Sequence, residues 1–147
     1  MQETAESTPE KLVVEGRFSG FTPEELFQYW VQPELITQWW PEEAVIDARE
    51  GGSFALSWPD MNWHLRGTYT VFEPGKRLGF TWKWDHDKPG WGPLQVMLTF
   101  AADAEGGTDM KVEHGPFGPD DAEERQGILE GWIHFGMHLA GLRVSTG

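Results

Sequence analysis

The chain reads FQYWVQPELITQWWP from Phe27 to Pro41, and this stretch decides the fold. It contains three of the nine tryptophans, Trp30, Trp39 and Trp40. Apolar residues recur at helical spacing on both sides of Pro33. Upstream, Thr22 is followed by a proline and two acidic residues, which is typical of a helix start. We therefore expect two short aromatic helices, the second ending at Pro41, that pack onto something concave.

Strands are expected on both sides of this segment, one before it at 12–18 and six after it. The six are predicted near 43–49, 53–58, 63–72, 77–84, 94–101 and 108–114, with turn residues such as Gly51-Gly52 and Gly106-Gly107 between them. In most of them apolar residues alternate with polar ones. This alternation is typical of an antiparallel sheet with one face against the core.

A long amphipathic helix is predicted from Asp121 to Val144, about 36 Å in length at 1.5 Å per residue. One side of it carries Ile128, Leu129, Trp132, Phe135, Gly136, Leu139 and Leu142. It is long enough to cover the apolar face of the whole sheet. The predicted class is α+β: a strand, two helices, six strands and one long C-terminal helix, with the curved antiparallel sheet wrapped around that helix in a helix-grip fold. Residues 1–10 are expected to be a frayed tail, and 11–147 a single domain.

Bulk composition excludes several classes of function. The chain has 147 residues and no cysteine, so a disulfide framework and thiol chemistry are excluded. A formal net charge of −13 argues against nucleic acid and anionic membranes as partners. Without a signal peptide or a membrane span in the sequence, a cytoplasmic location is expected. The oligomeric state, monomer or homodimer, stays open.

Motifs for catalysis and cofactors are missing from the sequence. It has no nucleophile elbow, no phosphate-binding glycine loop and no dinucleotide fingerprint, so no cofactor is expected. His134 and His138 stand at i and i+4, a spacing that can chelate a metal. They fall away from the apolar side of the helix, however, and lack the glutamate of the zincin motif. We expect an exposed polar stripe and no metal site.

The candidate binding residues are aromatic and aliphatic side chains that share the inward phase of the strands and the last helix. They are Trp39, Trp58, Trp63, Tyr69, Phe80, Trp82, Trp84, Val96, Leu98, Val112, His114, Trp132 and Phe135. These side chains either line a ligand cavity or simply fill the core. Each buried indole N–H needs a hydrogen-bond partner, so a closed core with many tryptophans must supply many acceptors. An open cavity is therefore favoured. His114 either orients a polar group of a ligand or ends its strand against a carbonyl. Trp39 and Trp40 either staple the second helix to the sheet or gate the cavity.

The stretch from Phe27 to Pro41 resembles the opening of the Hsp90 ATPase activator homologue (AHSA1-like) family of the START/Bet v 1-like (SRPBCC) superfamily. Further marks of the resemblance, over 12–142, are WHLRGTY at 63–69, LGFTW at 78–82, GGT at 106–108, EHG at 113–115 and GW at 131–132. The resemblance implies a helix-grip fold with a cavity between sheet and helix. It does not fix an activity, because one fold hosts many functions.

Three functions are compatible with the resemblance. The first is the binding of a small hydrophobic or aromatic ligand in the cavity, without enzymatic activity. The second is an Hsp90-linked stress or co-chaperone module. Stimulation of Hsp90 is not expected here, because the family's co-chaperones carry an additional N-terminal Hsp90-binding domain and only ten residues precede Lys11. The third is a polyketide-cyclase-like enzyme with His114 as the acid or base, although no paired carboxylate shares its phase.

Overall fold

The computed structural model describes residues 1–142 of the chain. The helices are α1 (Pro23–Val31), α2 (Pro33–Ile36), the 3-10 turn η1 (Pro59–Met61) and α3 (Ala122–Gly141). The strands are β1 (Gln2–Glu3), β2 (Leu12–Phe18), β3 (Glu43–Ile46), β4 (Ser53–Trp58), β5 (Trp63–Glu73), β6 (Arg77–Trp84), β7 (Leu94–Ala102) and β8 (Thr108–Gly115). They form one antiparallel sheet in the order β1-β2-β8-β7-β6-β5-β4-β3.

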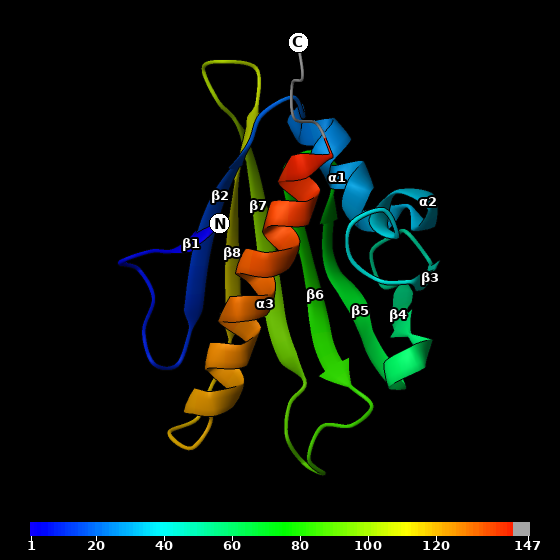
Figure 1. Ribbon diagram of the computed structural model, residues 1–147, viewed down its shortest axis with the longest axis vertical. Coiled ribbons are helices and arrows are strands. Elements are labelled where there is room, and N and C mark those ends of the chain that lie inside the picture. The colour runs from blue at the N-terminus through cyan, green and yellow to red at the C-terminus, as the bar shows by residue number, and fades with distance from the viewer. Residues whose placement is uncertain (143–147) are drawn as a thin grey trace.

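Helix α3 crosses the concave face of the sheet, in front of β8, β7 and β6 in Figure 1. Leu129, Trp132, Gly136 and Leu139 are the buried residues of this helix. The predicted helix-grip fold is therefore confirmed. The helix ends at Gly141, and the last part of the predicted span, 143–144, lies outside the described residues. Within residues 1–142, no helix is both long and apolar enough to cross a membrane.

The two short helices are present, and α1 begins as predicted. Thr22 Oγ1 accepts from Glu25 N at 3.2 Å, and Glu25 Oε1 accepts from Thr22 N at 3.2 Å, which makes a complete capping box. Helix α2 is shorter than predicted, because regular helix ends at Ile36 and turns carry the chain on through Trp40. This irregular end still directs Trp39 toward α1, where its indole Nε1 donates to Tyr29 O at 2.9 Å.

The strands agree with the predicted ones to within a few residues at each end. The alternation of inward and outward side chains is interrupted in β5, where the register with β6 shifts between Tyr69 and Val71. Beyond this bulge, Phe72 packs against Tyr69, with ring centroids 5.5 Å apart, and also against Phe27 of α1, at 5.2 Å. Simple alternation along the strand predicts that Val71 shares the inward phase of Leu65 and Tyr69. That prediction is wrong, because the bulge adds one residue and inverts the alternation that follows it.

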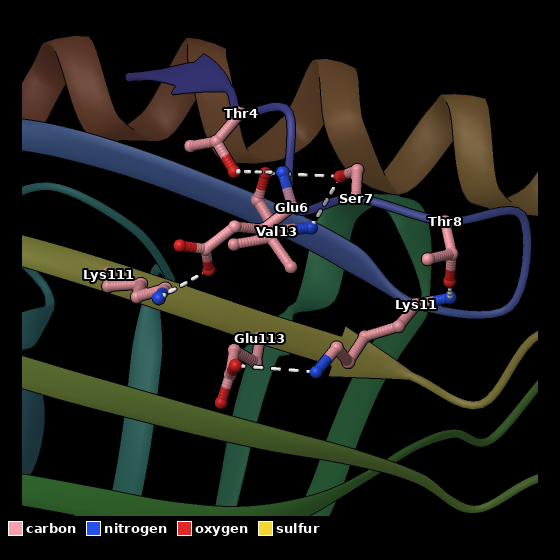
Figure 2. Close-up of polar contacts among 8 residues, drawn as sticks. All are labelled: Thr4, Glu6, Ser7, Thr8, Lys11, Val13, Lys111 and Glu113. Carbon is pink, nitrogen blue, oxygen red and sulfur yellow. Dashed lines mark hydrogen bonds and ion pairs between the residues drawn. The ribbon is translucent and has the colours of Figure 1, made fainter.

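The first ten residues differ from the frayed tail predicted for them. β1 pairs with β2, and the loop after it is tied down by side chains (Figure 2). Ser7 Oγ accepts from Val13 N at 2.7 Å, and Lys111 Nζ forms an ion pair with Glu6 at 2.5 Å. Lys11 Nζ reaches Glu113 at 3.4 Å. A polar composition predicts exposure, and most of this segment is exposed, but its backbone and side chains still find partners on the sheet.

Candidate functional site

A pocket of about 540 Å³ opens between the sheet and α3. We call it the tryptophan pocket, because eight of the nine tryptophans line it and Trp30 alone does not. Its lining residues are Trp39, Trp40, Trp58, Trp63, Trp82, Trp84, His86, Asp87, Lys88, Trp91, Glu124, Gly127, Ile128, Gly131, Trp132 and Phe135.

Four of these tryptophans come from the sheet, two of them from the same strand and two from a pair of neighbouring strands. Trp82 and Trp84 stand at i and i+2 on β6, so both point to the same face. Trp58 ends β4 and pairs directly with Trp63, the first residue of β5. Trp63 is 42% exposed and lies at the rim, whereas Trp82 is only 5% exposed. The four indoles therefore extend from the core out to the surface.

Trp40 is the hub of the aromatic wall. Its ring stacks on Trp82 with centroids 5.8 Å apart and planes tilted by 24°, and on Trp39 at 5.5 Å with the same tilt. It also lies 6.0 Å from Trp58 and 6.2 Å from Trp132. Trp40 thus joins the segment after α2 to the sheet and to α3. Two roles were predicted for it, attaching the second helix to the sheet and gating the cavity, and its contacts match the first.

The mouth of the pocket is formed by the loop between β6 and β7 and by the first turns of α3. Lys88 Nζ lies 3.1 Å from Glu124 Oε1, so an ion pair links the loop to the helix across the opening. Asp87 Oδ2 accepts from Trp84 N at 2.9 Å, which fixes the start of the loop. The mouth therefore carries two carboxylates and one ammonium group, while the interior is aromatic.

His114 lies behind the wall of the pocket and is fully buried. Its Nδ1 accepts from Trp132 Nε1 at 3.0 Å, and its ring centroid is 4.6 Å from that of Trp82. Because Nδ1 accepts, the proton of the neutral ring is on Nε2, which finds no hydrogen-bond partner within residues 1–142. Burial lowers the pKa of His114 from 6.5 to about 3, so the ring is neutral near pH 7.

The predicted site residues divide into two groups by position. Seven of them line the tryptophan pocket: Trp39, Trp58, Trp63, Trp82, Trp84, Trp132 and Phe135. The other six lie deeper or elsewhere in the core: Tyr69, Phe80, Val96, Leu98, Val112 and His114. Tyr69 and Phe80 border a void of only about 10 Å³, too small for a ligand. Strand phase identifies the inward face, but it does not distinguish the filled end of the sheet from the open end.

The sequence did not predict the part of the pocket contributed by the loop between β6 and β7 and by the first turns of α3. His86, Asp87, Lys88, Trp91 and Glu124 line this part, and no spacing in the sequence brings them to the mouth. One signal was available in Gly127 and Gly131, which stand at i and i+4 on α3. A Cβ placed on either would meet no atom within 4 Å, so these two glycines leave the helix side of the pocket open.

No group suited to metal binding is found among residues 1–142, where no three His, Asp or Glu side chains gather closely enough to hold an ion. His134 and His138 do lie close together, with ring centroids 4.6 Å apart. The described side chains around the tryptophan pocket offer indole faces, one imidazole and a few charged groups. Such a lining suits an apolar guest held by contact area and ring electrostatics.

Comparison with known proteins places the chain among a set of similar folds. The family model described as Activator of Hsp90 ATPase homolog 1-like protein matches residues 21–142. A comparison with curated proteins finds no match. Protein MLL2253 from Mesorhizobium loti is 29% identical with a TM-score of 0.79, over 90% of this chain and 95% of that one.

Two other solved structures are similar. CalU16 from Micromonospora echinospora is 25% identical with a TM-score of 0.69, over 88% of this chain and 75% of its own. Aha1 from Colwellia psychrerythraea, solved as a dimer in solution, is 12% identical with a TM-score of 0.79, over 93% of this chain and 98% of its own. At that identity the likeness to Aha1 shows the fold alone.

Proposed function

The chain belongs to the Activator of Hsp90 ATPase homolog 1-like family, as its sequence predicted, and we propose that it binds a small hydrophobic or aromatic molecule in the tryptophan pocket. The observation that carries the proposal is the concentration of eight tryptophans around one opening of about 540 Å³. A domain that needed these indoles only for its core would pack them against one another. Here they also border unfilled space.

The size and chemistry of the pocket support this function. Its volume is within the range of roughly 300–1,000 Å³ that is typical of small-molecule sites. Indole rings give a ligand a large contact area at little cost in side-chain entropy.

A steric block on α3 tests the proposal with a matched control. Gly131 lines the pocket and Gly141 does not, and a Cβ on either meets nothing within 4 Å. Gly131→Leu therefore adds a side chain on the pocket side of α3 at a position whose Cβ meets no other atom, and Gly141→Leu adds the same side chain to the same helix outside the pocket. The probe is N-phenyl-1-naphthylamine, a neutral dye that fluoresces in apolar sites.

We expect saturable binding of one dye to the wild type and to Gly141→Leu, and at least a tenfold loss of affinity in Gly131→Leu. Equal affinity in all three proteins, with unchanged far-ultraviolet circular dichroism, would place the dye elsewhere and refute the proposal. An enzymatic role for His114 is not part of it. That ring touches Trp82 and Trp132 but does not line the pocket, so it is not in position to exchange a proton with a guest there.

The oligomeric state is a separate matter, on which the sequence left monomer and homodimer open. The structure of Aha1 from Colwellia psychrerythraea is that of a dimer, which makes a homodimer of this chain a reasonable proposal. Sedimentation velocity at several protein concentrations would decide it. A single species at the monomer mass of 16.7 kDa across the range would reject the dimer.

A further inference from the structure

The walls of the tryptophan pocket carry a characteristic electrostatic field. The face of an indole ring is electron-rich, and tryptophan is the aromatic residue that attracts a cation most strongly. Eight indoles surround this space, and the hub residue Trp40 stacks on Trp82 and on Trp39. The aromatic interior by itself therefore favours a positively charged guest over a neutral one of the same shape.

The charged groups at the mouth act in the same direction. Among the described residues, Lys88 is the one lysine or arginine in the lining, and it is already paired with Glu124 at 3.1 Å. Its pKa is raised by the hydrogen bond to Glu124 and further by the charges of Asp121 and Asp120, so several carboxylates surround this one ammonium group. Asp87 adds another at the rim. The mouth is thus negative in sum, although it contains a lysine.

Other cations near the pocket are engaged elsewhere. Lys83 is on β6, and its Nζ donates to the carbonyl oxygen of Trp91 in the loop between β6 and β7. Arg66 forms a two-point ion pair with Asp85, at 2.8 and 3.1 Å. Neither side chain lines the pocket. The chain as a whole carries a net charge of −13, and such a field attracts cations and slows the approach of anions.

We propose that the ligand of the tryptophan pocket is an apolar organic cation, held by the indole faces and by the carboxylates of Asp87 and Glu124. The inference rests on the proposed binding function and adds the charge of the ligand to it. Apolar surface alone would favour a neutral molecule over a cation of equal shape, because removing a charge from water is costly. The ring faces and the carboxylates favour the cation, and they reject an anion of similar size.

Three probes of nearly equal shape separate charge from size: 1-methylquinolinium is the cation, 1-methylnaphthalene its neutral counterpart, and 1-naphthoate the anion. Binding is measured by isothermal titration calorimetry and by the shifts of indole N–H resonances in protein labelled with ¹⁵N-tryptophan. We expect the cation to bind about tenfold more tightly than the neutral molecule, and the anion to bind most weakly. The preference should shrink as salt is added.

Two variants test the part played by the mouth. Glu124→Gln removes the partner of Lys88, and Asp87→Asn removes a charge while keeping an oxygen that can accept from Trp84 N. Each should weaken the cation several-fold, strengthen the anion and leave 1-methylnaphthalene unchanged. Unchanged affinity for the cation in both variants would overturn the role of the carboxylates.

Failure of this inference can be told apart from failure of the proposed function. If 1-methylnaphthalene binds as tightly as 1-methylquinolinium, and Gly131→Leu abolishes both, the charge preference is overturned and the hydrophobic pocket stands. If none of the three probes binds at millimolar concentration, or if binding persists in Gly131→Leu, both the inference and the proposed function are overturned.

Discussion

Acidification should destabilise this protein through one buried ring. His114 is fully buried, and its pKa in the folded state is about 3, compared with 6.5 for a histidine in water. Between these two values the unfolded chain binds a proton that the folded chain does not. The free energy of unfolding is therefore at its full value above pH 6.5 and falls as the pH decreases toward 3.

The size of the effect follows from the two pKa values. Between pH 7 and pH 4.5, protonation of the unfolded chain at His114 removes about 2.5 kcal/mol of stability, since each pKa unit corresponds to about 1.4 kcal/mol. Urea unfolding followed by far-ultraviolet circular dichroism at both pH values gives the difference. It is a large share of the roughly 5–15 kcal/mol by which most domains are stable.

The matched control is His114→Asn. The side-chain oxygen of asparagine occupies the position of Nδ1 and can accept from Trp132 Nε1, but it does not titrate in this range. Carboxylates with lowered pKa values, such as Glu73, Asp85 and Asp103, also lose stability in acid, but they are present in both proteins and cancel. If the wild type and His114→Asn lose the same stability between pH 7 and pH 4.5, the reasoning about the buried ring is wrong.

Three further changes test the packing. Trp132→Phe leaves His114 Nδ1 without its donor and should cost about 2–3 kcal/mol in urea unfolding, most of which should disappear in a His114→Leu background. Gly67→Ala should cost about 3 kcal/mol, because the new Cβ would lie 2.1 Å from the carbonyl oxygen of Thr81; a midpoint equal to that of the wild type would show that the strands can move apart. Arg17→Ala removes two exposed ion pairs and should change the thermal midpoint only slightly, with the difference vanishing in high salt; a large change that persists in salt would contradict the assignment.

The fold was predictable because its signals are local. Pro33 divides the helices, and the helix start predicted at Thr22 is confirmed, with Glu25 completing a capping box there. Alternation set the register of β6 and β7, and glycine pairs marked the turns. The bulge near Val71 was not predictable, since an inserted residue leaves no mark in a pattern of period two until the partner strand is known.

The pocket was predictable only in part, for a physical reason. Strand phase found Trp82 and Trp84, and it found Val112 and Leu98 equally, because all four point to the same face of the sheet. Which end of that face is filled depends on where α1 and α2 pack. The loop and the start of α3, which complete the mouth, are brought together by tertiary structure and by the pair of Lys88 and Glu124.

The close contacts among the tryptophan rings also have an optical consequence. With neighbouring indoles stacked, tilted or edge-to-face at centroid separations between 4.7 and 6.2 Å, the energy of absorbed light passes from ring to ring before it is emitted. The intrinsic fluorescence of this protein therefore comes from a coupled array, and emission cannot be assigned to a single residue. A quenching molecule seated beside Trp40 would dim most of the array at once, and exciton coupling among the rings should give strong near-ultraviolet circular dichroism that disappears when the sheet and α3 separate.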